Sequence, residues 1–276
     1  MKLKIFIIPV LAFFVLIVSC KKDDAEPKDE KIIKLFTHSV YGEILVDGDG
    51  RALYFYSKDA DGSSQCSDGC LDAWPVFFAE NIMIDTQMSK DDFGFITRAD
   101  NTPQVTYKGW PLYYYVSDVD EGVVTCDGVE DAWFVAKPDY TIMLANNQLV
   151  GADENNYNSN YELGNEVVQY FVDKEGNTLY TFVDDEANTN TYTASDFSNN
   201  GSWPVYEEDL KNVPSTLDKS LFSNITVFGK TQLTYKGWPL YYYGSDSKRG
   251  ETKGVSVPTP GRWPVAVQTV NEAPVP

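Results

Sequence analysis

The chain has 276 residues, with 41 acidic side chains, 22 basic side chains and a formal charge of −19 at pH 7. This excess of negative charge repels phosphate backbones and anionic lipid surfaces, so nucleic acid is not an expected partner. The only histidine is His38, which argues against Ser-His-Asp catalysis, Cys-His catalysis and histidine-rich zinc sites.

The N-terminus has the features of an exported lipoprotein. Lys2 and Lys4 precede an apolar run at residues 5–18, which is short for a membrane span and has the charge order of an export signal. Ile17-Val18-Ser19-Cys20 resembles a bacterial lipobox, which implies a signal peptide at residues 1–19 and lipid attachment at Cys20. A plain secretory signal and an uncleaved anchor are the alternatives.

Residues 20–37 are charged and contain proline, which predicts a flexible tether. Within it, Lys21-Lys22-Asp23-Asp24 resembles the acidic export tag that sends lipoproteins of some Gram-negative bacteria to the outer face of the outer membrane. A merely polar tether is the alternative. We expect a bacterial cell-envelope protein that is lipid-anchored, in the outer membrane and displayed at the cell surface.

After the tether the chain repeats itself. The pattern Leu-Tyr, any residue, aromatic, two residues and Asp occurs four times, and a tryptophan follows each copy. The copies begin at Leu53, Leu112, Leu179 and Leu240, and the tryptophans are Trp74, Trp133, Trp203 and Trp263. Residues 106–115 recur unchanged at 234–243, and residues 46–54 are echoed at 172–180. One supersecondary unit was therefore copied, and the plan is two tandem halves, each with an A unit and a B unit.

Within each unit, aromatic and β-branched residues alternate with period two between Gly, Asp and Asn, which predicts strands and hairpins. Further strands are expected at 93–98 and 225–228, with short helical turns at 89–92 and 217–221. The predicted fold class is all-β, with two tandem antiparallel domains of about six strands, each a sandwich or a partly closed barrel. A four-bladed propeller-like closure of the four hairpin repeats is the alternative.

The expected boundaries follow from the repeats. The first domain is predicted at residues 38–140, a linker at 141–165, the second domain at 166–270 and a tail at 271–276. Inside the linker region, residues 140–144 and 148–151 are expected to pair as a small hairpin.

The repeat motif supplies the first candidate site. Alternate residues of a strand share a face, so the two aromatic residues of each copy project together. They form either a core layer or an exposed platform for stacking a sugar, and each aspartate either fixes a turn or contributes to a cation site. We expect the structural roles and no metal site, because neither Asp-rich turn, 47–50 or 59–62, has a complete calcium-loop spacing. The motif residues are Tyr54, Tyr56, Asp59, Tyr113, Tyr115, Asp118, Tyr180, Phe182, Asp185, Tyr241, Tyr243 and Asp246.

Three further cysteines supply the second candidate site. Cys66 and Cys70 lie in one Gly-containing loop and are the expected disulfide, with Cys126 as the rival partner. The alternative is a redox or metal-handling role for all three, although the spacing differs from that of thioredoxin-like sites. The second half has no cysteine.

These motifs together resemble the secreted-repeat lipoprotein family, which is marked by a Tyr-x-aromatic-x-x-Asp motif. The resemblance rests on residues 64–75, which continue the A unit, and on residues 104–113 of the B unit, and it covers most of 40–270. Residues 195–199 replace the cysteine loop in the second half. The family has no established biochemical activity, so the resemblance implies none.

We therefore predict a lipid-anchored envelope repeat protein that is not an enzyme, uses no cofactor and acts as a binding or structural module. A membrane holds it through the lipid, and a polysaccharide or an envelope protein is the expected ligand. A redox or metal-handling accessory protein using Cys66, Cys70 and Cys126 is the alternative. A two-carboxylate glycosidase also stays open, because Asp and Glu are plentiful.

Overall fold

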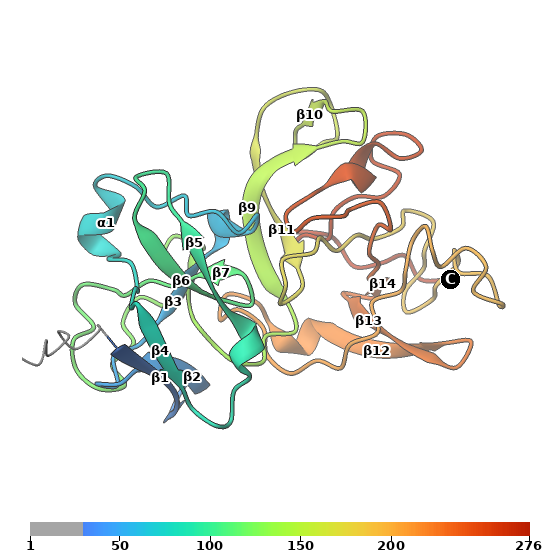
Figure 1. Cartoon of the computed structure of the whole chain (residues 1–276). Helices are drawn as coiled ribbons and strands as arrows, with labels where there is room; N and C mark the ends of the chain where they lie inside the picture. The colour runs from blue at the N-terminus through green and yellow to red at the C-terminus, as the bar shows by residue number, and fades with distance from the viewer. Residues whose placement is uncertain (1–29) are drawn as a thin grey trace, which may run out of the picture.

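The computed structural model describes residues 30–276; the expected signal peptide and the lipid-attachment site at Cys20 lie outside these residues. The predicted all-β class is confirmed (Figure 1). The strands are β1 (Glu30–His38), β2 (Gly42–Asp47), β3 (Tyr54–Tyr56), β4 (Asn81–Ile84), β5 (Phe93–Thr97), β6 (Pro103–Tyr107), β7 (Trp110–Pro111), β8 (Trp133–Val135), β9 (Met143–Val150), β10 (Asn156–Tyr157), β11 (Val167–Val172), β12 (Phe222–Val227), β13 (Lys230–Tyr235) and β14 (Trp238–Pro239). The short helices are η1 (Ser57–Asp59), α1 (Cys70–Ala73), η2 (Lys90–Asp92), η3 (Lys219–Leu221) and η4 (Lys253–Ser256).

The strands assemble into several small sheets. Their orders are β2-β1-β4, β3-β8 and β5-β6-β7 in the first half, and β10-β9-β11 and β12-β13-β14 in the second. All these pairs are antiparallel except β1 with β4. One reason the sheets stay small is that β7 and β14 end at prolines, which have no N–H to donate to a further ladder bond. Residues 30–276 contain no closed barrel, and the four-bladed alternative is not confirmed.

The two halves repeat the same hairpins. β5 pairs with β6 as β12 pairs with β13, and the β6–β7 turn at Lys108-Gly109 matches the β13–β14 turn at Lys236-Gly237. Lys108 and Lys236 both have φ of 49°, and the two glycines have φ of 77° and 83°. Two successive residues with positive φ form the tight turn that follows the natural twist of paired strands, and glycine adopts that conformation without strain.

Both predicted helical turns exist, with a side-chain cap in each. Ser89 accepts a hydrogen bond from the Asp91 N–H at the start of η2, and Asp218 accepts one from the Ser220 N–H at the start of η3. Each cap satisfies a backbone donor that a short helix leaves free.

The region expected as a linker contains a long strand. Residues 143–150 form β9, which pairs with β11 along its length and with β10 near its end. The small hairpin predicted between 140–144 and 148–151 is therefore wrong, because the chain runs straight through Asn146 and Asn147 and pairs with 167–172 instead. Strand β1 likewise begins at residue 30, inside the stretch expected as a tether.

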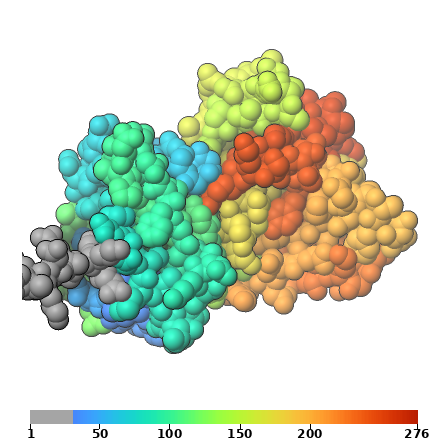
Figure 2. Space-filling model, viewed as in Figure 1, coloured from blue at the N-terminus to red at the C-terminus, as the bar shows by residue number. Residues whose placement is uncertain are grey.

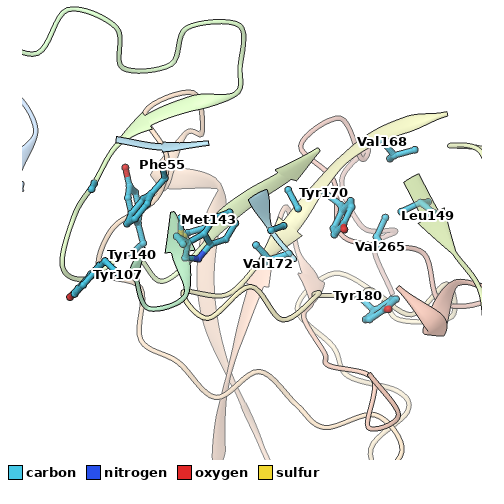
Figure 3. Packing of buried hydrophobic residues seen from close by; sticks show 14 of the residues in the cluster. Phe55, Tyr107, Tyr140, Met143, Leu149, Val168, Tyr170, Val172, Tyr180 and Val265 are labelled. Atoms are coloured by element: carbon cyan, nitrogen blue, oxygen red, sulfur yellow. The ribbon is translucent and has the colours of Figure 1, made fainter. Parts of the chain in front are cut away.

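The two halves adjoin as neighbouring lobes (Figure 2) and share the largest of three buried clusters in the described part of the chain. The largest buried cluster takes Phe55, Tyr107 and Trp110 from the first half together with Tyr170 and Tyr180 from the second. Figure 3 shows this cluster running along β9 and β11. The Trp110 indole N–H also donates to the carbonyl of Lys174 at 3.0 Å, which ties a hairpin of one half to a turn of the other. Within residues 30–276 no helix has the length and apolar character of a membrane span.

Candidate functional site

The first tyrosine of each repeat motif pairs with the first tyrosine of the other unit in the same half. The Tyr54 N–H donates to the Tyr113 carbonyl at 2.8 Å, and the Tyr113 N–H returns a bond to the Tyr54 carbonyl at 3.0 Å. Tyr180 and Tyr241 exchange the same two bonds at 2.8 and 2.9 Å. Two residues that exchange both bonds form the closed pair of an antiparallel ladder, so each half has an approximate local two-fold relation between its A and B units.

The hydroxyl groups of these tyrosines extend the exchange to the aspartates. In the first half the Tyr113 hydroxyl donates to Asp59 at 2.6 Å, and the Tyr54 hydroxyl donates to Asp118. In this half the first tyrosine of each motif is therefore bonded to the aspartate of the opposite unit and not to its own.

The second half repeats this exchange. The Tyr241 hydroxyl donates to Asp185 at 2.7 Å, and the Tyr180 hydroxyl donates to Asp246 at 2.6 Å. All four tyrosines are fully buried, and buried hydroxyl and carboxyl groups are costly unless they are hydrogen-bonded. The motif thus lets two units bury polar groups that neither unit can satisfy alone.

Each carboxylate also accepts backbone bonds that fix the following turn. Asp59 accepts from the Gln65 N–H at 2.7 Å, and Asp185 accepts from the Thr191 N–H at 2.7 Å. Asp246 accepts from the Lys253 N–H at 3.0 Å. Burial raises the pKa of Asp59 to about 7, that of Asp185 to about 6 and that of Asp246 to about 7, although the donated bonds oppose the rise. These aspartates therefore combine the predicted turn-fixing role with the tyrosine contact.

The second aromatic residue of each motif and the following tryptophan form a stack that also crosses between units. In the first half the indoles of Trp74 and Trp133 stack with centroids 3.9 Å apart and planes 1° apart. Tyr56 of the A unit covers the B-unit indole Trp133 at 4.0 Å, and Tyr115 of the B unit contacts the A-unit indole Trp74 at 4.8 Å.

The second half has the same four-ring arrangement. Trp203 and Trp263 stack at 3.8 Å, Phe182 covers Trp263 at 4.3 Å and Tyr243 contacts Trp203 at 4.5 Å. The two indoles are buried in each half, whereas the end rings Tyr115 and Tyr243 are half-buried. Since most ring faces are covered by other rings, the motif offers no continuous platform on which a sugar could stack.

Cys66 and Cys70 are joined in a disulfide, and Cys126 is a free, buried thiol. The Cys66 carbonyl accepts a bond from Arg98 Nη2 at 2.6 Å, and Arg98 Nη1 donates to Gln104 Oε1 at 2.9 Å. The cysteine loop thus covers a buried arginine, which in turn holds the glutamine next to the B motif.

The second half holds the equivalent glutamine in place without a cysteine. Gln232 takes the place of Gln104, and its Oε1 accepts from the Asn190 side chain at 2.7 Å. In both halves the glutamine Nε2 donates to the carbonyl of the motif leucine, Leu112 or Leu240, at 2.8 and 2.9 Å. The disulfide loop and Asn190 are two solutions to one local hydrogen-bonding requirement.

The Asp-rich turns considered for calcium use their carboxylates internally. Asp47 Oδ1 accepts from the N–H groups of Asp49 and Arg51, and Asp61 Oδ1 accepts from the N–H and hydroxyl of Ser63. Among residues 30–276 no three His, Cys, Asp or Glu side chains are placed to hold a metal ion together.

A cleft of about 390 Å³ lies where the two halves meet, and the motif residues take no part in it. Its lining includes Asp61 from the first half and, from the second, Val150, Glu154, Lys248, Arg249 and Lys253. Side chains of both charges therefore face one space beside an apolar patch. We take this junction cleft as the candidate functional site.

Arg249 connects the cleft to the junction itself. Its Nε donates to the Ala60 carbonyl at 2.7 Å, its Nη1 donates to the Lys108 carbonyl at 3.1 Å, and its guanidinium lies 4.9 Å from the Trp110 ring. Burial lowers the pKa of Arg249 to about 10, against the opposing effect of nearby carboxylates such as Asp61. At neutral pH the group is still charged, so it holds the halves together as a cation.

Arg249 is not among the residues predicted from the sequence. Equivalent turns of the two halves make matching backbone hydrogen bonds. The Gly122 N–H donates to the Gly50 carbonyl in the first half, and the Gly250 N–H donates to the Gly176 carbonyl in the second. This match places Arg249 at the position held by Glu121 in the first half. A charge reversal at equivalent repeat positions was the available signal, because a residue that differs between copies is free of the shared structural role.

The motif corresponds to a known repeat. A family model described as a secreted repeat of unknown function matches residues 37–77, 94–137 and 226–267. No curated protein and no solved structure matches the chain. The A unit of the second half lies outside the matched segments, although Tyr180 and Asp185 occupy the same places there as Tyr54 and Asp59 do in the first half.

Proposed function

Because the chain belongs to the family of secreted repeats of unknown function, we propose that it is a lipid-anchored module of the bacterial cell envelope that binds a partner and catalyses no reaction. The proposal rests on the contrast between the repeat motif and the junction cleft. The polar groups of the repeat motif bond to one another inside each half, so they form a scaffold. The junction cleft, in contrast, is lined by side chains outside the motif and is open to a ligand.

The chemistry of the cleft favours a neutral, hydroxyl-rich partner. The lining of the cleft carries Asp61, Glu154 and Glu251 together with Lys248, Arg249 and Lys253, so a ligand of a single charge sign meets repulsion from half of these charged side chains. A polysaccharide presents hydroxyl groups that donate to carboxylates and accept from ammonium groups, and its apolar ring faces suit a surface such as Val150. We therefore propose an envelope or extracellular polysaccharide, with an envelope protein as the rival outcome.

The experiment compares binding of the protein to cell-wall and extracellular polysaccharides with binding to envelope protein fractions. Ala152 lies exposed in the lining of the cleft, so Ala152→Trp places an indole in the cleft without touching the motif. Val40→Trp adds the same bulk at an exposed position on the β1–β2 turn and is the matched control. Binding that Ala152→Trp removes and Val40→Trp retains supports the proposal. A polysaccharide bound equally by both variants places its site elsewhere, and the absence of binding to any polysaccharide contradicts the ligand class.

The anchor is tested separately. Cys20→Ser should abolish incorporation of labelled fatty acid and release the protein from the membrane fraction, since lipid on Cys20 is the proposed attachment. Digestion of intact cells with a protease then reports surface display. A Cys20→Ser protein that stays with the membrane would show that the attachment is of another kind.

Thiol counting separates this proposal from the redox or metal-handling alternative. Cys20 is not counted, because its thiol carries the proposed lipid. The mature protein is then expected to show one free thiol, that of Cys126, before reduction and three free thiols after reduction. A bound metal, or a partner that dissociates on reduction, would support the alternative.

A further inference from the structure

The two halves differ in the side chain that packs against the B motif. In the first half, Arg51 lies against the B motif. Its Nε donates to the Asp118 carbonyl at 2.8 Å, and its Nη2 donates to the Tyr115 carbonyl at 2.7 Å. Its guanidinium stands 4.2 Å from the centroid of the Tyr114 ring. One cation thus meets an aromatic face and two carbonyl oxygens, the arrangement a planar guanidinium favours.

The second half builds the same frame. The Tyr242 hydroxyl donates to Asp173 Oδ2 at 2.8 Å, as the Tyr114 hydroxyl donates to Asp47 Oδ2 at 2.8 Å. The Tyr242 N–H donates to the Pro204 carbonyl, as the Tyr114 N–H donates to the Pro75 carbonyl, and both bonds measure 2.8 Å. The ring and the backbone that surround Arg51 therefore recur.

The arginine does not recur. Asn177 stands at the position of Arg51, and its short side chain turns back to donate to Asp173 Oδ2 at 2.9 Å. The space that the arginine side chain fills in the first half is a cavity of about 380 Å³ in the second. Its lining includes Asn177, Thr178, Pro204, Tyr242, Tyr243 and Asp246.

The two acceptors of the frame are also available. The Tyr243 carbonyl accepts the Asp246 N–H at 3.0 Å, just as the Tyr115 carbonyl accepts the Asp118 N–H at 3.2 Å while it also bonds Arg51. The Asp246 carbonyl, which matches the one that Arg51 Nε contacts, has no protein donor within residues 30–276. At the rim an exposed Gly244 replaces Val116, and the backbone of Gly201 lies where a side chain at position 244 would project.

We propose that this cavity binds a guanidinium group supplied by a ligand, either the side chain of an arginine in a partner protein or a small guanidinium compound. The bound group stacks on Tyr242 and donates to the carbonyls of Tyr243 and Asp246, as Arg51 does within its own half. A lysine ammonium has no planar face to stack and no fork of donors, so the site selects arginine over lysine. The chain's negative charge favours any cationic ligand equally and does not provide that selection.

Two substitutions exchange the residues that the two halves have at this position. Asn177→Arg supplies the second half with the residue that fills the frame of the first, and Arg51→Asn opens the first half in the way the second is open. Calorimetric titration of the full chain uses N-acetyl-arginine amide, an arginine-containing peptide and the lysine counterpart of each. The wild type is expected to bind one arginine group, Asn177→Arg to weaken that binding at least about tenfold, and Arg51→Asn to bind two groups.

Tyr242→Leu is a second variant, which removes the ring and is expected to weaken arginine binding while leaving Asn177 in place. A peptide that binds more tightly than the capped amino acid identifies a protein partner, whereas equal binding identifies a small guanidinium compound. Arginine bound no better than lysine, or undiminished by Asn177→Arg, overturns the proposal. The cavity is distinct from the junction cleft and the probes contain no polysaccharide, so either proposal can fail without the other.

Discussion

The hydrogen bond between Tyr241 and Asp185 allows a prediction of how much the repeat motif contributes to the free energy of unfolding. The hydroxyl donates to the carboxylate at 2.7 Å, and both residues are fully buried. A hydrogen bond to a charged group contributes about 1.5–3 kcal/mol, against about 1 kcal/mol for a neutral pair. Tyr241→Phe keeps the ring and removes only the donor, so we expect it to lower the free energy of unfolding by about 1.5–3 kcal/mol at pH 8.

The cost of the substitution should depend on pH. The pKa of Asp185 is raised to about 6 by burial, so in the folded protein the carboxyl is ionised at pH 8 and protonated at pH 4.5. The lost bond is charge-assisted only in the first case, and the cost should fall to about 1 kcal/mol at pH 4.5.

A matched control is available in the same half. The Tyr206 hydroxyl is as deeply buried but donates to a neutral acceptor, the Thr141 carbonyl, at 2.6 Å. Tyr206→Phe should therefore cost about 1 kcal/mol at both pH values. Urea unfolding followed by tryptophan fluorescence measures both variants. Equal costs for Tyr241→Phe and Tyr206→Phe at pH 8, with no change for either at pH 4.5, would refute a charge-assisted bond at the centre of the repeat.

The other predictions concern the same scaffold. Asp59, Asp185 and Asp246 have raised pKa values in the folded protein, so between about pH 4 and 7 the folded state binds more protons than the unfolded state and stability falls as pH rises. Denaturant unfolding should show roughly 2–3 kcal/mol more stability at pH 5 than at pH 8 from Asp59 alone, and Asp59→Asn should reduce that difference. Trp263→Ala removes a central ring of a stack and should cost about 3–5 kcal/mol, whereas Trp238→Ala, at a half-buried indole, should cost about 1 kcal/mol; similar values for both would argue against the stack. Replacing Cys66 and Cys70 by serine opens a loop with a sequence separation of only 4, so the loss should be about 2 kcal/mol and the protein should still fold; failure to fold would mean that the loop does more than cover Arg98.

The sequence was sufficient for those features that depend on local periodicity. The strands predicted at 93–98 and 225–228 correspond to β5 and β12, although β12 begins three residues earlier, and the Lys-Gly turns and the two capped turns also follow from residue types a few positions apart. Strand β9 was harder to predict. Its Asn146-Asn147 pair is typical of a turn, and only the partner strand at 167–172 keeps the chain extended there.

The candidate site depends on contacts between distant residues, which periodicity does not contain. The motif spacing predicts that Tyr54 and Asp59 lie near one strand end, but it does not say that each bonds to the other unit. The choice of partner is decided by the antiparallel exchange between Tyr54 and Tyr113, a non-local pairing. The junction cleft is harder still, because Arg249 acquires its role only when the two halves meet.

The crossed pairing also explains why the units occur in pairs. A single unit folded alone would bury a tyrosine hydroxyl and an aspartate with no partner for either, and an unpaired buried polar group costs more than its bond contributes. The B unit at 226–267 matches the family model, whereas the A unit before it does not. That A unit lacks the cysteine loop and has phenylalanine at position 182, yet Tyr180 and Asp185 bond to the B unit. The residues that the crossed pairing requires are present in the unit that otherwise differs most, so the pair of units, and not the single repeat, is the element within which these polar groups are satisfied.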